Sequence, residues 1–115
     1  MLRTIFAAAL SCAVLSSAIA LELGEASFYG GKHHGRKMAN GQVFDQWSDS
    51  CAHKKHRFGT SLRVTHMVSR RSVVCVVRDR GPFVRGRIVD LSVKSASDLG
   101  IRVQGVAPVT VEVIP

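Results

Sequence analysis

The residues most suited to chemistry lie in the stretch VRDRGPFVRGRIVDLS, residues 77–92. Two carboxyl groups, Asp79 and Asp90, each follow an apolar, strand-like run. Four arginines crowd around them: Arg78, Arg80, Arg85 and Arg87. A positioned carboxyl group can donate and accept a proton during catalysis, and arginine can bind a substrate carboxylate through two parallel hydrogen bonds. The same acids also fit structural roles, in which Asp79 pairs with Arg80 or Arg87 and Asp90 accepts hydrogen bonds from nearby backbone amides.

A histidine and two cysteines complete the set of reactive side chains. His53 could orient one of the carboxyl groups, or it could be a half-exposed strand histidine without a catalytic role. Cys51 and Cys75 form an even pair, which predicts a disulfide in an oxidising compartment. Closing that loop would stabilise the fold by roughly 3 kcal/mol. Two cysteines are too few for a structural zinc site, and the pair His53 and His56 has no matching partner motif, so we expect no metal site.

The first twenty residues have the pattern of a secretory signal peptide. Arg3 supplies a positive start, residues 5–15 are almost unbroken apolar sequence, and residues 18–20 fit a small-x-small cleavage site. The apolar stretch is short for a membrane span, although a retained anchor is the alternative. Cys12 follows a poor lipobox, so we do not expect a lipoprotein. We expect export to the periplasm, cleavage after Ala20, and a mature chain of 95 residues without a membrane span.

The mature chain is strongly basic. After residue 20 there remain fifteen Lys and Arg residues against eight Asp and Glu residues. Such a surplus attracts polyanions, among them nucleic acid, anionic lipid and anionic cell-wall polymers. Export argues against nucleic acid as a partner. A solvated basic surface without a dedicated partner is the alternative.

Short strand-like segments separated by turns dominate the mature chain. Apolar patterns predict strands over residues 21–29, 51–53, 61–68, 72–77, 87–91 and 106–114. The run 72–77 carries apolar, β-branched residues on both faces, which is typical of a central strand. Ser92 and Gly100 fit the two caps of one short helix, residues 93–99. Six or so strands and one helix indicate a single domain, residues 21–115, that is mainly β and folds as a compact barrel.

Several short motifs occur in an order that resembles the RlpA (rare lipoprotein A) family. They are GEASFYG at 24–30, HG at 34–35, ANG at 39–41, AH at 52–53, FGT at 58–60, DRGPF at 79–83 and GRIVDLS at 86–92. The resemblance covers residues 24–113 and is carried by the ordered set. It implies a six-stranded double-psi β-barrel, the fold of barwin, expansins and family-45 endoglucanases. It also implies an endolytic lytic transglycosylase that acts on the glycan strands of peptidoglycan, often on naked strands without stem peptides.

The resemblance assigns catalytic positions one at a time. The family's histidine in the Ala-His motif matches His53, its acid in the Asp-Arg-Gly-Pro motif matches Asp79, and its acid in the strand before the helix matches Asp90. Many members have a glutamate directly after Asn-Gly, where this chain has Gln42, an amide that cannot exchange a catalytic proton. The implied reaction cleaves the linkage between MurNAc and GlcNAc and closes a 1,6-anhydro ring on MurNAc. Since no external water attacks, one acid that later acts as base can suffice, and we expect Asp79 to do this with His53 assisting.

Substrate contacts are expected from polar and aromatic residues near these groups. We expect them from Gln42, Tyr29, Arg80 and Arg87, with arginines binding the lactyl carboxylates of muramic acid residues. The alternatives are that the arginines are solvated surface residues without a substrate role and that Tyr29 is an aromatic residue of the core. The chemistry needs no cofactor, and we expect a monomer whose partner is the peptidoglycan glycan strand. The rival function is a non-catalytic, expansin-like module that binds glycan without cutting it, and hydrolysis of β-1,4-glucan is a third.

Overall fold

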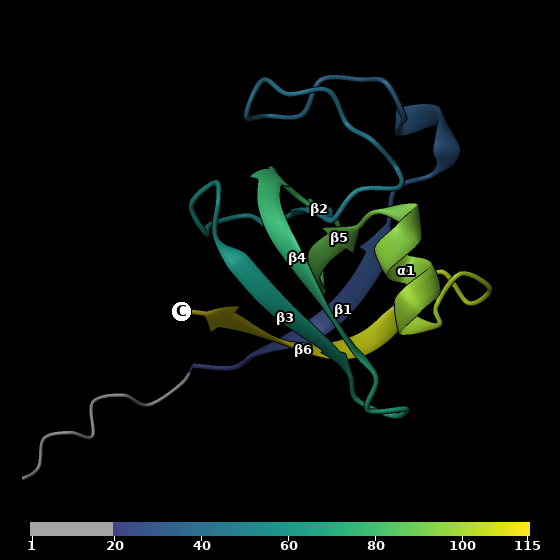
Figure 1. Cartoon of the computed structure of the whole chain (residues 1–115). Helices are drawn as coiled ribbons and strands as arrows, with labels where there is room; N and C mark the ends of the chain where they lie inside the picture. The colour runs from purple at the N-terminus through teal and green to yellow at the C-terminus, as the bar shows by residue number, and fades with distance from the viewer. Residues whose placement is uncertain (1–19) are drawn as a thin grey trace, which may run out of the picture.

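The computed structural model describes residues 20–115, which form a barrel with one helix packed beside it (Figure 1). In chain order the elements are β1 (Glu22–Phe28), the 3-10 helix η2 (Gly31–His33), β2 (Ser50–Ala52), β3 (Ser61–His66), β4 (Ser72–Asp79), β5 (Arg87–Leu91), α1 (Val93–Leu99) and β6 (Ala107–Ile114). Within these residues, no helix has the length and apolar character that a membrane crossing requires. The predicted signal peptide, apart from its last residue, lies outside the described residues.

Six strands close the barrel in the order β1-β5-β2-β4-β3-β6, with β6 pairing back onto β1. The pairs β1–β5 and β2–β4 are parallel, and the other pairs are antiparallel. Parallel strands cannot be joined by a tight hairpin, so each parallel pair is separated in the sequence by other parts of the barrel. Residues that are far apart in the sequence therefore become neighbours. The barrel predicted from the sequence is confirmed.

The interior of the barrel is filled by the inward-facing residues of the strands. Because side chains alternate between the two faces of a strand, every second residue is buried in β3 and in most of β6. Leu62 and Val64 of β3 and Val109 and Val111 of β6 are fully buried. Burying one such aliphatic side chain contributes about 1.5–3 kcal/mol. Val113 continues the sequence pattern but is 43% exposed, because it lies near the end of β6.

Strand β4 carries the disulfide and the first of the two acids. Cys75 of β4 and Cys51 of β2 form the predicted disulfide, with their Cα atoms 5.8 Å apart. β4 pairs with β2 on one side and β3 on the other, and every strand of the closed barrel likewise has two neighbours. β4 runs two residues further than predicted and ends at Asp79. Its outer face is not fully covered, since Val74 is 49% exposed.

Helix α1 begins and ends at the residues that the sequence indicates. Ser92 at the N-cap accepts a hydrogen bond from the Ser95 N–H at 3.1 Å through its Oγ, which satisfies one of the free amides of the first turn. Gly100 at the C-cap has a φ of 83°, in the left-handed region that favours glycine. Lys94 pairs with Asp98 at 2.9 Å on the exposed side. The helix follows directly on β5 and thereby fixes the end of that strand.

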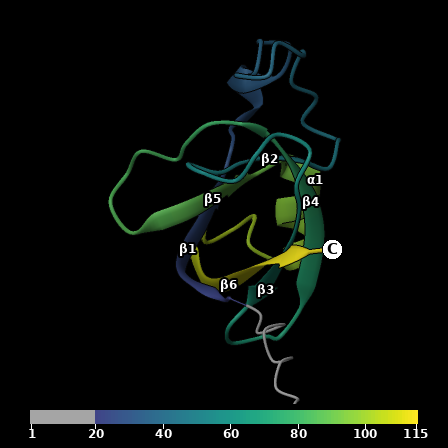
Figure 2. The same cartoon turned by 90° about the vertical axis from the view of Figure 1, so that its left-hand side faces the viewer.

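A long loop, residues 29–49, connects β1 to β2 and extends beyond one end of the barrel (Figure 1). Its tip is a small hairpin in which Lys37 and Val43 form an isolated antiparallel β-bridge. The predicted Asn40-Gly41 turn reverses the chain there, with Gly41 at φ 92°. The Asn40 N–H donates to the carbonyl of Arg78 at 3.2 Å, so the hairpin is tied to the end of β4. A second loop, residues 80–86, joins β4 to β5 and projects to the side of the barrel (Figure 2). Both loops therefore meet the end of β4.

Candidate active site

The two acids singled out in the sequence lie on the two strands that flank β2. Ala52 of β2 pairs with Asp79 of β4 on one side and with Asp90 of β5 on the other. Neighbouring strands are about 4.8 Å apart, so the backbones of the two acids are separated by roughly 10 Å. The closed barrel thus brings together two carboxyl groups from strands that do not pair with each other.

Three donors hold the carboxylate of Asp79. Tyr29 donates its phenol O–H to Oδ2 at 2.5 Å, and the N–H groups of Ala39 and Arg80 donate to Oδ1 at 2.8 Å and 2.9 Å. These donors come from the end of β1, from the hairpin and from the residue after β4. Within residues 20–115 no ion pair joins Asp79 to Arg80 or Arg87, the pairing that a purely structural role would have used.

Asp90 is half-buried and lies in different surroundings. Its Oδ1 accepts a hydrogen bond from Ser27 Oγ of β1. Burial raises the pKa of Asp90 above its ordinary value, and the charge of Asp79 adds to the rise. The hydrogen bond from Ser27 and the charges of Arg87 and His33 oppose the rise without cancelling it. A carboxyl group with a raised pKa keeps its proton to higher pH, which suits a general acid.

Tyr29 connects this pair of acids to the long loop. Burial raises the pKa of Tyr29 well above its ordinary value, and the hydrogen bond to Asp79 and the charges of both acids add to the rise. The phenol therefore stays protonated and remains a donor. Its ring packs edge-on against Phe44 at 4.8 Å and lies 5.1 Å from the His33 ring, distances that aromatic pairs favour. Tyr29, expected from the sequence to contact substrate, thus also positions Asp79.

A groove of about 380 Å³ lies between the hairpin, the last residues of the long loop and Arg78 of β4, and neither Asp79 nor Asp90 lines it. Its lining includes Gln42 from the hairpin together with Asp49, Ser50 and Arg78. Arg78 donates to Asp49 at 2.6 Å and to Ser50 Oγ at 2.8 Å, so its guanidinium is held at the groove. The volume lies within the range of small-molecule sites, and polar groups predominate. Gln42, predicted to contact substrate, therefore lies where a sugar could bind.

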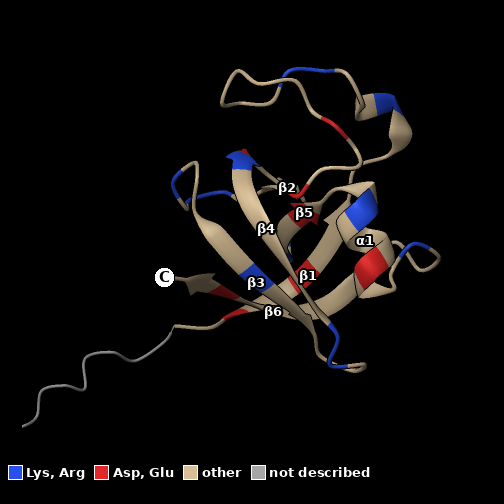
Figure 3. Ribbon diagram, in the orientation of Figure 1, with Lys and Arg blue, Asp and Glu red and all other residues tan. Residues whose placement is uncertain are grey.

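Lysine and arginine residues lie mainly in the loops and at the strand ends (Figure 3). Arg80 has a structural contact there: its Nη1 donates to the carbonyls of His53 and His56 at 3.1 Å and 2.7 Å, and its guanidinium lies 4.1 Å from the ring centre of Phe58. These contacts compete with the substrate contact expected of Arg80. Arg87 is half-buried at the start of β5, and its charge acts on the second acid.

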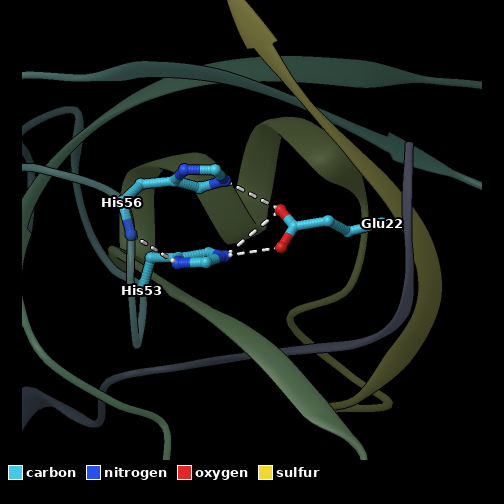
Figure 4. Close-up of side chains that lie close together, drawn as sticks. All are labelled: Glu22, His53 and His56. Atoms are coloured by element: carbon cyan, nitrogen blue, oxygen red, sulfur yellow. Dashed lines mark hydrogen bonds and ion pairs between the residues drawn. The ribbon is translucent and has the colours of Figure 1, made fainter. Parts of the chain in front are cut away.

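The ring of His53 does not join the two aspartates. Only its backbone N–H reaches Asp79, donating to the carbonyl oxygen at 3.2 Å. The side chain of His53 is 5% exposed, so the alternative of a half-exposed histidine is wrong. It faces Glu22 of β1 and lies beside the ring of His56 (Figure 4). Of the three predicted catalytic residues, the structure therefore groups two and places the side chain of the third elsewhere.

Glu22 and His56 are polar residues whose roles could not be read from the sequence. Glu22 is 31 positions from His53 and on another strand, so no local pattern connects the two. One ring nitrogen of each histidine and one carboxylate oxygen of Glu22 lie within 4.8 Å of one another. Two histidines and a carboxylate are common ligands of transition metals, whereas the expectation of no metal site considered the two cysteines and the two histidines but not Glu22. Which nitrogen of His53 carries the proton decides whether a metal fits.

A closed six-stranded barrel with a pair of carboxyl groups beside its shortest strand defines the class: a double-psi β-barrel with an acidic centre. The chain belongs to the lytic transglycolase family, whose model matches residues 22–111. The family resemblance expected from the sequence motifs is confirmed.

Relatives with assigned names agree with this family. The chain is 45% identical over 91 residues to the endolytic peptidoglycan transglycosylase RlpA of Campylobacter jejuni, covering 79% of this chain and 33% of that protein. It is 43% identical over 93 residues to the protein of the same name from Vibrio cholerae, covering 81% of this chain and 35% of that protein. The chain thus spans about a third of the length of these relatives.

Two solved structures share the fold. A papain inhibitor from Streptomyces superposes with a TM-score of 0.66 at 22% identity, covering 84% of this chain and 96% of the inhibitor. A mutant expansin of Clavibacter michiganensis, solved in complex with cellohexaose, superposes with a TM-score of 0.63 at 19% identity, covering 84% of this chain and 51% of the expansin. At these identities the likeness concerns the fold alone.

Proposed function

We propose that this domain is an endolytic lytic transglycosylase that cleaves MurNAc–GlcNAc linkages of peptidoglycan and leaves 1,6-anhydro-MurNAc ends. The observation that carries the proposal is the pair Asp79 and Asp90, which flank Ala52 in unlike surroundings. Burial raises the pKa of Asp90, whereas Asp79 accepts three hydrogen bonds. Membership of the lytic transglycolase family and the names of the relatives support the same activity.

In the first step Asp90 donates its proton to the glycosidic oxygen. The bond between this oxygen and C1 of MurNAc breaks, its electron pair stays with the departing GlcNAc oxygen, and positive charge develops on the MurNAc ring. An acid in this role must still hold a proton at the working pH, and burial of Asp90 shifts its pKa in that direction. The nearby carboxylate of Asp79 favours the positive charge of the transition state.

In the second step the 6-hydroxyl of the same MurNAc attacks C1 and closes the anhydro ring. Its proton passes to Asp79, so no water is consumed. Proton exchange with solvent then returns Asp79 to its carboxylate and Asp90 to its acid form before the next turnover. The three donors on Asp79 keep the carboxylate oriented toward this proton. This scheme divides between two groups the roles of acid and base that the sequence assigned to Asp79 alone, because burial raises the pKa of Asp90.

The groove supplies the contacts for the glycan in this proposal. Gln42 and Arg78 line it, and the guanidinium of Arg78 can pair with the lactyl carboxylate of a naked muramic residue. Arg87, on the strand of Asp90, is the second candidate for such a pair. Tyr29 both contacts the sugar and positions Asp79 in this proposal. Arg80 mainly holds the turn after β2 through the carbonyls of His53 and His56.

The proposed substrate also sets the compartment. Peptidoglycan lies outside the cytoplasm, which fits the predicted signal peptide, a periplasmic location and the disulfide between Cys51 and Cys75. We propose that residues 21–115 act as a monomeric domain on glycan strands, with protein groups alone performing the proton transfers and no nucleic acid involved.

The direct test is incubation of the purified protein with glycan strands freed of stem peptides. Mass spectrometry of the products should show anhydromuramic ends and internal cleavage. Reducing ends instead of anhydromuramic ends would indicate hydrolysis of the glycan. Reducing sugar released from cellulose would favour the alternative function, hydrolysis of β-1,4-glucan. Binding without any product, from protein shown by NMR to be folded, would indicate an expansin-like module and would refute the proposal.

A further inference from the structure

The residues Glu22, His53 and His56, called the Glu22 cluster below, join the start of β1 to the turn that follows β2 (Figure 4). Nε2 of His53 lies 3.2 Å from each carboxylate oxygen of Glu22, and Nε2 of His56 lies 3.0 Å from Oε1. The ring centres are 4.2 Å apart and the planes are tilted by 33°, so both rings present Nε2 to the same carboxylate. The cluster therefore links two segments that are far apart in the sequence.

The other nitrogen of the His53 ring decides what this cluster can hold. Nδ1 accepts the backbone N–H groups of Lys55 at 3.0 Å and His56 at 3.2 Å. A nitrogen that accepts N–H bonds must keep its lone pair, so the proton of the neutral ring is on Nε2. Burial lowers the pKa of His53, although the charge of Glu22 opposes the change, and the ring therefore stays neutral at pH 7.

This protonation state does not fit a three-ligand metal centre. The Nε2–H of His53 donates to Glu22 and has no lone pair left for a metal ion. Histidines that bind a metal through Nε2 usually donate from Nδ1 to an acceptor, whereas this Nδ1 faces two donors. The cluster is thus better described as a carboxylate that accepts hydrogen bonds and fixes a turn.

The same turn reaches the acidic centre through its backbone. The carbonyls of His53 and His56 both accept from the guanidinium of Arg80. The N–H of Arg80 donates to Asp79 Oδ1 at 2.9 Å, and the N–H of His53 donates to the Asp79 carbonyl at 3.2 Å. The side chains of the turn therefore hold Glu22, while its backbone holds Arg80 and Asp79.

We propose that Glu22 is a positioning residue for Asp79 and acts through the turn 53–56 and Arg80. Glu22 touches no reacting atom. It supplies the acceptor for the buried N–H of His53, and without that acceptor the donor would be left unpaired and the turn would rearrange. A rearranged turn would release Arg80 and displace the Asp79 carboxylate. The activity part of this inference rests on the proposed transglycosylase function, whereas the structural link does not.

The kinetic test compares three variants. Glu22→Ala removes the acceptor, and Glu22→Gln keeps an amide oxygen for His53 and offers an N–H to His56. Glu25→Gln is the matched control, because Glu25 is exposed on the same strand and makes no ion pair within residues 20–115. For release of anhydro ends, Glu22→Ala should lower kcat by about tenfold or more, as misplacement of a reacting group does. KM should change less than about twofold.

Rescue separates positioning from stability alone. Glu22→Gln should recover much of the lost kcat, and Glu25→Gln should match the wild type. If Glu22→Ala lowers the melting temperature but leaves kcat per folded molecule unchanged, Glu22 is merely structural and the proposal is overturned.

Nitrogen-15 NMR of the histidine rings tests the link without any turnover. The wild type should show the Nε2–H tautomer of His53, and Glu22→Ala should shift the amide resonances of Asp79 and Arg80 and lower the pKa of His53 further. An Nδ1–H tautomer, unmoved amide resonances, or one Zn²⁺ bound per chain by both rings would overturn the proposal. If the wild type cuts no glycan but Glu22→Ala still shifts the amide resonances of Asp79 and Arg80, the proposed function is refuted and the structural link from Glu22 to Asp79 stands.

Discussion

The barrel contains two carboxylate clusters that handle protons in opposite ways, and β1 contributes to both. Near the end of β1, Ser27 donates a hydrogen bond to Asp90, and Tyr29, the first residue after β1, donates one to Asp79. At its start, Glu22 accepts from two imidazole rings. In the first cluster two acids lie near each other, and in the second one acid lies between two donors. The neighbours of a carboxyl group, rather than the group itself, set what it can do.

The difference has a simple electrostatic origin. A carboxyl group that is buried beside another negative charge gains by keeping its proton, and this raises the pKa of Asp90. A buried imidazole gains by staying neutral, and this lowers the pKa of His53. The first cluster is therefore suited to exchange a proton with a substrate, and the second to hold a proton in place.

The largest expected effect comes from removing the base of the first cluster. Asp79→Asn keeps the shape of the side chain and an oxygen that can accept from Tyr29, but it cannot take up the proton of the 6-hydroxyl. We expect kcat for anhydro ends to fall by about 10²- to 10⁴-fold, the usual contribution of general acid–base catalysis. Asp98→Asn on the exposed side of α1 is the control and should leave kcat unchanged. A fully active Asp79→Asn variant would remove the functional contrast between the clusters.

A smaller effect is expected from Tyr29→Phe. The change deletes one of three hydrogen bonds to Asp79 and leaves the ring contact with Phe44. Hydrogen bonds to a charged group contribute about 1.5–3 kcal/mol, and we expect kcat to fall by roughly tenfold. If KM rises instead while kcat holds, Tyr29 binds the sugar and does not position the acid.

The smallest expected effect is on the free energy of unfolding, and it tests the protonation state of His53 in the second cluster. Because the pKa of His53 is lower in the folded than in the unfolded chain, the unfolded chain binds more protons as the pH falls below its ordinary value of 6.5. The free energy of unfolding should therefore decrease as the pH falls from about 6.5 toward the pKa of the folded state. Denaturant unfolding at several pH values measures this slope. His53→Asn, which retains an acceptor near Nδ1 but does not titrate, should flatten it, and an unchanged slope would assign it to other histidines.

The sequence could predict the features that depend on local pattern. Alternating apolar residues marked β6, Ser92 and Gly100 marked the ends of α1, and the even pair of cysteines marked the disulfide. The positions of Asp79 and Asp90 at strand ends were likewise visible, because each follows an apolar run.

The contacts that define the two clusters could not be predicted from local pattern. The pairing of Ser27 with Asp90 spans 63 positions, and it exists because β1 and β5 run parallel in the closed barrel. The role of Glu22 depends on the same closure. Arg80, expected at the substrate, instead binds the carbonyls of a turn whose backbone conformation the sequence does not reveal. The two acids also have different hydrogen-bond donors, which come from distant parts of the chain and which a motif does not encode.

One measurement bears on the proton donor itself: the yield of anhydromuramic ends from stem-peptide-free glycan by Asp90→Asn beside the wild type, both shown to be folded. If a half-buried, protonated Asp90 starts the cleavage, the amide, which cannot give up that proton, should reduce the rate by about 10²-fold or more. An undiminished rate would mean that the bond breaks without a proton from position 90, and the assignment of acid and base made here would be incorrect.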